Sequence, residues 1–76
     1  MTIVNHTLAD KLKCNNGLFD VTTELGHFYS GCSFVSFDNH LGDVNVITTI
    51  NILVLKDVKG KQFTVFEGEQ IAIKFI

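Results

Sequence analysis

Arginine is absent from this chain, and all six of its basic residues are lysines. Arginine is the usual residue for bidentate contacts to phosphates and bases, so its absence argues against a nucleic-acid-binding protein. The net charge of −2 and the isoelectric point near 5.8 point the same way, because nucleic-acid association depends on a positive field. We therefore expect a protein partner rather than a nucleic acid.

Long apolar runs and a secretory signal are also missing. No stretch approaches the roughly 18 apolar residues that span a bilayer, and the first residues carry neither a basic nor an apolar leader region. We therefore expect a cytoplasmic protein with no membrane association and with free thiols at its two cysteines, Cys14 and Cys32. Proline is absent as well, and nothing marks a linker or a repeat, so the 76 residues should form one domain over residues 1–76.

Hydrophobic residues are abundant, at 46% against 18% charged, and β-prone segments dominate. A short strand at 2–4 precedes a brief helix that begins after Asn5 or Thr7 and ends at Lys13. Further strands are predicted over residues 18–24, 28–37 (with a bulge or bend at Gly31), 44–56, 62–66 and 71–76. The predicted fold is mainly β: a small antiparallel barrel or strongly bent sheet of SH3-like size, with five to six strands and one short N-terminal helix.

The hairpin between the predicted strands 44–56 and 62–66 sets which side chains face inward. A four-residue loop places Val54 opposite Phe63 and Ile52 opposite Val65, and a three-residue second loop places Val65 opposite Ile71. The inner face then collects Val44, Val46, Ile50, Ile52, Val54, Phe63, Val65, Ile71, Ile73 and Phe75. A three-residue first loop would exchange the two faces of the long strand.

The opposite face remains rich in apolar side chains, more than a short helix covers. A solvent-facing sheet surface is normally polar, so this second apolar face predicts a protein interface. Its residues, together with an aromatic side chain suited to an interface, are Leu53, Leu55, Phe66, Ile76 and Tyr29. The strand at 71–76, guarded only by Lys74, offers a sheet edge as a second route to association.

Groups that would carry catalysis or bind a metal are not arranged in recognisable patterns. Cys14, His27, Cys32 and His40 lack the paired spacing of a zinc site. The segment 29–33 lacks the strand-turn-helix context of a nucleophile elbow. We therefore expect no enzyme, no metal and no cofactor.

These observations predict a non-catalytic protein-binding module: a small inhibitor, adaptor or assembly protein, of a kind common in phage and mobile elements, that binds a protein partner or forms a homo-oligomer. The alternative is a nucleic-acid-binding small barrel that uses the hairpin lysines Lys56, Lys59 and Lys61, with Phe63 or Phe66 as stacking rings.

Overall fold

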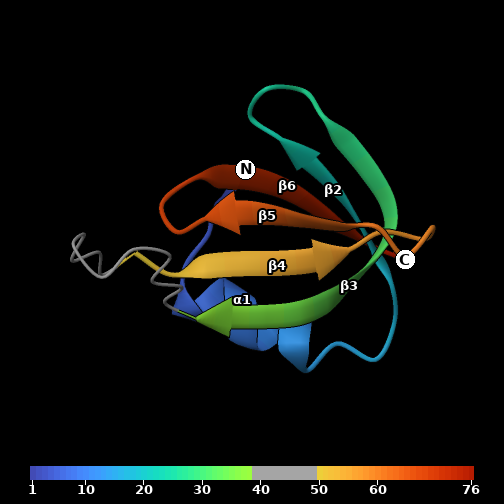
Figure 1. Cartoon of the computed structure of the whole chain (residues 1–76), viewed down its shortest axis with the longest axis horizontal. Helices are drawn as coiled ribbons and strands as arrows, with labels where there is room; N and C mark the ends of the chain where they lie inside the picture. Colours follow the sequence, from blue (N-terminus) through green and yellow to red (C-terminus); the bar gives the residue numbers. More distant parts are fainter. Residues whose placement is uncertain (39–49) are drawn as a thin grey trace.

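The computed structural model describes residues 1–38 and 50–76, which form six strands and one helix (Figure 1). The elements are β1 (Thr2–Ile3), α1 (His6–Lys13), β2 (Phe19–Thr23), β3 (Phe28–Asp38), β4 (Ile52–Lys56), β5 (Gln62–Phe66) and β6 (Gln70–Phe75). All strand pairs are antiparallel and form one sheet in the order β1-β6-β2-β3-β4-β5. The predicted mainly-β fold with a short N-terminal helix is confirmed. The prediction left a barrel and a strongly bent sheet open; the described strands form an open sheet with β1 and β5 at its ends, and the barrel is not confirmed.

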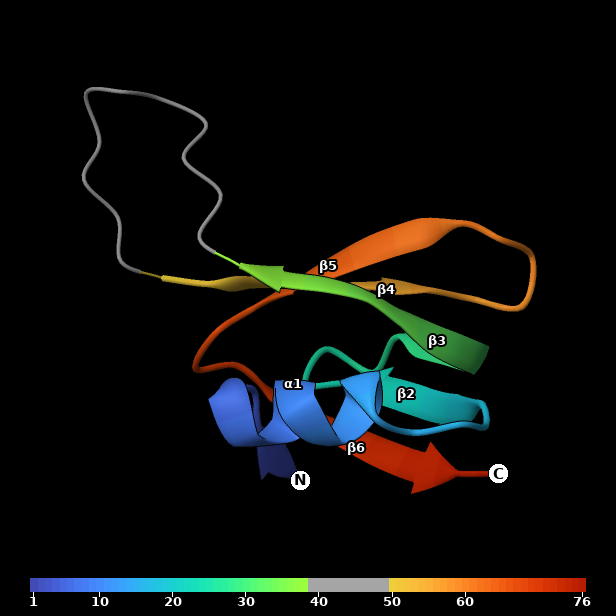
Figure 2. The ribbon, with the colours of Figure 1, turned by 90° about the horizontal axis from the view of Figure 1, so that it is seen from below.

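Strand β3 bends the sheet because it pairs with β2 along its first half and with β4 along its second. The β2–β3 register shifts where Ser30 and Gly31 lie opposite Asp20, and Gly31 has a φ of 60°. An Asp20 side-chain oxygen accepts a hydrogen bond from the Gly31 N–H at 3.1 Å, which fixes the bulge. The predicted bulge at Gly31 is therefore confirmed. Figure 2 shows the resulting two layers, with β4 and β5 above β2 and β6.

Helix α1 begins where predicted, since the Asn5 side chain accepts a hydrogen bond from the Leu8 N–H at 2.9 Å. One helix face buries Leu8, Ala9 and Leu12. These side chains join residues of both layers in a single core, which comprises Val4, Leu8, Ala9, Leu12, Phe19, Val21, Cys32, Leu53, Leu55, Val65 and Ile71. This helix, with eight residues, is the only one in the described segments, and it is too short to cross a membrane.

The β4–β5 hairpin has the shorter of the two loops considered from the sequence. The Asp57 N–H donates to the Lys61 carbonyl at 3.0 Å, which leaves a three-residue loop with Gly60 at a φ of 84°. Leu55 therefore lies opposite Phe63, and Leu53 lies opposite Val65. The prediction that Leu53 and Leu55 face outward is wrong, because the register differs by one residue and both side chains are fully buried.

The predicted pairing of Val65 with Ile71 is also wrong. The turn after β5 carries the chain into the other layer, where β6 pairs with β2, for example Val21 with Ile73, and with β1. The Gly68 N–H donates to the Val4 carbonyl at 2.9 Å, which ties this turn to the N-terminal segment.

The long strand predicted over residues 44–56 is shorter in the part that the structure describes. Strand β4 begins at Ile52, and residues 50 and 51 precede it outside any strand. The Asn51 N–H instead donates to the Glu67 side chain at 3.2 Å. Residues 44–49 of the predicted strand, and 39–43 of the predicted loop before it, lie outside the described residues.

Candidate functional site

Strand β5 is one end of the sheet, and its outer edge carries backbone groups that no described strand pairs. The Glu67 N–H donates to the Asn51 carbonyl at 2.9 Å, and the Asp57 N–H donates to the Lys61 carbonyl at 3.0 Å. The backbone N–H and C=O groups of the odd-numbered residues of β5 are therefore directed towards β4. By the alternation of an antiparallel ladder, the backbone groups of Gln62 and Thr64 face away from β4. Phe66 directs its N–H the same way, while its carbonyl accepts from the Glu69 N–H at 3.1 Å.

Strand β5 itself lacks two of the features that normally prevent strands from adding to a sheet, charged residues and proline. The five residues of β5, Gln62–Phe66, contain no charged residue and no proline. Natural edge strands are usually protected by lysines, prolines, bulges or a covering element. The edge of β5 is therefore suited to pairing with another strand.

The convex face of the sheet next to this edge carries four apolar side chains among polar ones, which include Ser36, Asp38, Gln62 and Thr64. Ile52 and Val54 are half-buried in β4, and Val35, the extra residue at the second β3 bulge, is exposed. Phe66 lies opposite Ile52 and is 50% exposed. A shallow groove of about 390 Å³ crosses this face between β3 and β5. We call Val35, Ile52, Val54 and Phe66 the outer apolar face; of these four residues, only Phe66 belongs to the interface predicted from the sequence.

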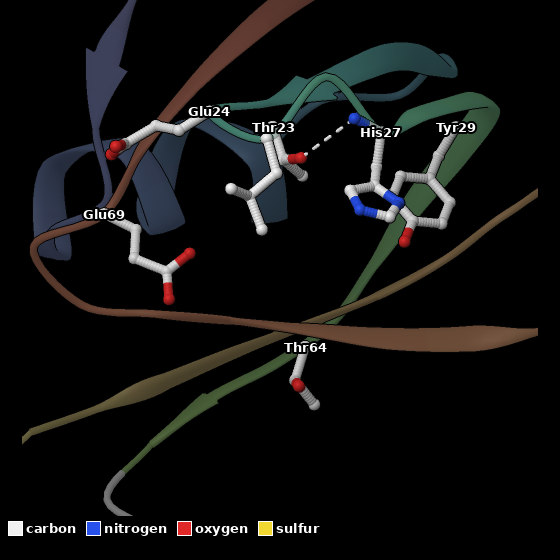
Figure 3. A pocket seen from close by; sticks show the side chains of 7 residues that line it. Thr23, Glu24, His27, Tyr29, Thr64 and Glu69 are labelled. Carbon is white, nitrogen blue, oxygen red and sulfur yellow. Dashed lines mark hydrogen bonds between the residues drawn. The ribbon is translucent and has the colours of Figure 1, made fainter.

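On the concave side, a cleft of about 350 Å³ separates β5 from the β2–β3 turn. Figure 3 shows Thr23 and His27 above the opening, with Thr64 on the β5 side and Glu69 at one end. At the other end, the ring of Tyr29 stacks on Phe63 with centroids 3.8 Å apart and planes at 8°. The cleft is lined by Thr23, Glu24, Leu25, His27, Tyr29, Thr64 and Glu69.

The residues of the predicted interface do not lie together on one surface. Leu53 and Leu55 belong to the core, so they cannot contact a partner of the folded chain. Phe66 is on the outer apolar face, and Ile76, which is 77% exposed, follows β6 in the other layer. Tyr29 is half-buried against Phe63 and lines the cleft.

The hairpin lysines are exposed, and the two rings proposed to accompany them lie at different distances along β5. Lys56, Lys59 and Lys61 lie at the β4–β5 hairpin. Phe63 is stacked on Tyr29, and Phe66 is at the opposite end of β5. Of the three lysines, Lys59 lines a surface hollow with two rings, Phe28 and Tyr29.

The potential metal ligands among the described residues are dispersed. Cys14 is exposed at the end of α1, His27 lies in the β2–β3 turn, and Cys32 is buried, while His40 lies outside the described residues. In residues 1–38 and 50–76, no three His, Cys, Asp or Glu side chains are grouped as a metal site requires.

The two thiols differ sharply in their surroundings. Burial, followed by the nearby carboxylates of Asp57 and Asp20, raises the pKa of Cys32 to about 11. Its thiol also lies 3.5 Å from the Tyr29 carbonyl, to which it donates. Since the thiolate is the reactive form, Cys32 should be inert at neutral and mildly alkaline pH.

We expect Ellman's reagent at pH 8 to modify one thiol per native chain rapidly and two per chain in 6 M guanidinium, because only Cys14 is exposed. A Cys14→Ser variant should show almost no rapid reaction when native. Two rapidly reacting thiols in the native wild-type chain would contradict the burial of Cys32.

Protein-family models, curated proteins and solved structures provide no match to this chain. The features of this chain that bear on a function are the β5 edge, the outer apolar face and the cleft.

The sequence analysis missed most residues of this region. Gln62 and Thr64 are ordinary strand residues whose importance comes from their unpaired backbone, and His27 and Glu69 meet only through the fold. The available signal was the lack of any charged residue or proline in the predicted strand Gln62–Phe66, which is short enough to lie at a sheet edge.

Proposed function

We propose that this chain is a non-catalytic protein-binding module that pairs the edge of β5 with a strand from a second copy of itself or from another protein. The observation that carries the proposal is the uncharged, proline-free edge of β5, where Gln62, Thr64 and Phe66 direct unpaired backbone groups outward. Main-chain hydrogen bonds at such an edge supply affinity, and side-chain contacts beside it supply specificity.

The outer apolar face supports the same function. It continues across β3, β4 and β5 up to the edge, so a strand that adds to β5 also extends this face. Side chains of the added strand that pack beside Phe66 would stabilise the complex at about 25 cal/mol per Å² of apolar surface removed from water.

Self-association has a second edge available to it. Strand β1 covers only Gln70 and Ile71 of β6, and the Ile76 N–H donates to the Leu18 carbonyl at 3.0 Å. By alternation, the backbone groups of Ile73 and Phe75 face away from β2 and meet no described strand. One chain therefore carries two different edges, as a head-to-tail homo-oligomer requires.

Light scattering over a concentration series from about 10 µM to 1 mM tests the proposal. The wild-type mass should rise with concentration, and Thr64→Pro should remain a monomer, because proline removes the outward N–H without breaking the β4–β5 ladder. Thr64→Val keeps that N–H and should behave like the wild type. Phe66→Asp should also weaken association while leaving the fold intact, since this side chain is half-exposed.

A monomer at every concentration would remove the homo-oligomer form of the proposal. Pull-down from host lysate with the wild type and Thr64→Pro then tests the other form, and equal recovery of partners by both proteins would contradict a role for the β5 edge.

A further inference from the structure

We infer that the cleft beside β5 receives a lysine or arginine side chain from the strand that adds to the β5 edge. This inference depends on the proposed function. It specifies the chemistry of the partner: an extended segment whose single charged residue is a central lysine or arginine.

The position of the cleft determines which part of an added strand enters it. Phe63 and Val65 face the core side of β5, and the cleft opens on that side, between the strand and the β2–β3 turn (Figure 3). A strand paired with β5 continues the sheet, and its side chains alternate between the convex and concave faces. Its concave-facing side chains therefore project towards His27, Tyr29 and Glu69.

The charge of the cleft selects a cation. The Glu69 carboxylate points into the opening in Figure 3. Glu24 lies at the same end, where its side chain accepts the Gln70 N–H at 2.6 Å. No lysine or arginine is among the seven lining residues. The Glu24 carboxylate points away from the opening in Figure 3, so an added strand with a basic residue at this position would meet the Glu69 carboxylate, whereas one with an acidic residue would be repelled by it.

The shape of the cleft suits a long side chain rather than a free ion. The Tyr29 ring is held in place by its stack on Phe63 and forms one wall, and the apolar side chain of Leu25 lies on the rim. Lysine and arginine place an apolar stem along such surfaces while the charged group reaches a carboxylate. A cation near the ring of Tyr29 is also attracted by its π-face.

The test uses three blocked, fluorescein-labelled heptapeptides in an anisotropy titration at low salt: Thr-Val-Thr-Lys-Thr-Val-Thr and the same sequence with Glu or Gln in place of Lys. Their alternation puts the valines and the central residue on one face of a strand. With the wild type, the Lys peptide should bind about tenfold more tightly than the Glu peptide, with the Gln peptide between them.

Two charge variants distinguish the effect of the cleft carboxylate on peptide preference from the effect of the net charge of the domain. Glu69→Gln should reduce the preference for Lys over Glu to about threefold, because the carboxylate that points into the cleft is lost and only the net negative charge of the domain remains. Asp10→Asn, which removes one charge from the exposed side of α1, should leave the preference at about tenfold. Equal loss of preference in both variants would overturn the inference.

Two edge variants report on strand addition separately. Thr64→Pro should abolish binding of all three peptides, and Gln62→Pro provides a second block at the same edge if the first variant does not fold. Equal binding of the three peptides, all blocked by Thr64→Pro, would overturn the cationic preference and leave the proposed edge function standing. Absence of peptide binding at 1 mM would also overturn the inference. The proposed function is tested separately, by the light-scattering series.

Discussion

Leu55→Asp is expected to leave the chain unfolded at 25 °C. Leu55 has no exposed surface and packs in the core with Leu53 and Val65. A domain of this size has a free energy of unfolding of roughly 4–11 kcal/mol. A buried carboxylate without a partner, added to the lost leucine contacts, costs a large share of that or all of it. Far-ultraviolet circular dichroism of the purified variant, compared with the wild type, should show loss of the β-sheet signal.

A milder change and a surface control make this result specific. Leu55→Ala should remain folded with a free energy of unfolding about 3 kcal/mol lower, measured by urea titration. Phe66→Asp, on the same hairpin but half-exposed, should shift that free energy by no more than about 1 kcal/mol. If Leu55→Asp and Phe66→Asp had similar urea midpoints, the register of the β4–β5 hairpin would be wrong.

Gly31→Ala is expected to lower the free energy of unfolding by about 2–5 kcal/mol. Gly31 has a φ of 60°, which costs a residue with a Cβ atom roughly 1–2 kcal/mol. A Cβ atom at this position would also lie 2.9 Å from the Cβ of Val58, and overpacking of this kind adds roughly 1–3 kcal/mol. Urea unfolding followed by tyrosine fluorescence measures the change.

Gly60→Ala provides a matched control, because Gly60 also has a positive φ, 84°, but a Cβ atom added there would meet nothing within 4 Å. It should lose only the backbone part, about 1 kcal/mol. Val58→Gly removes the clashing atom, so its combination with Gly31→Ala should recover the steric part of the loss. Equal losses for Gly31→Ala and Gly60→Ala would show that Val58 does not crowd the bulge.

Local signals in the sequence were sufficient for most elements of the fold. The capping residue Asn5 and the apolar spacing of Leu8 and Leu12 specify α1, and the glycine at position 31 marks the bulge. Such features act over a few residues, so a single sequence contains them. The order of the strands does not follow from such features, because the pairing of β6 with β2 joins residues far apart in the chain.

The candidate site was harder to predict for a related reason. The inward or outward direction of Leu53 and Leu55 depends on a difference of one residue in a hairpin loop, and both loop lengths agree with the sequence. With the three-residue loop, Leu53 and Leu55 face the core, and Ile52 and Val54 are the apolar side chains on the outer face of β4. The cleft brings His27 and Glu69 together across two layers, and no spacing in the sequence indicates that proximity.

The pairing of β2 with β6 also determines when this protein can fold. Phe19 lies opposite Phe75, so the ladder that completes one layer pairs two strands that are separated by most of the described sequence. Ladders of such long sequence separation form slowly, because the entropy of loop closure is lost before the contacts are gained. During synthesis, β2 has no partner on that side until β6 has left the ribosome, and Phe19 and Val21 stay open to solvent or to chaperones until then.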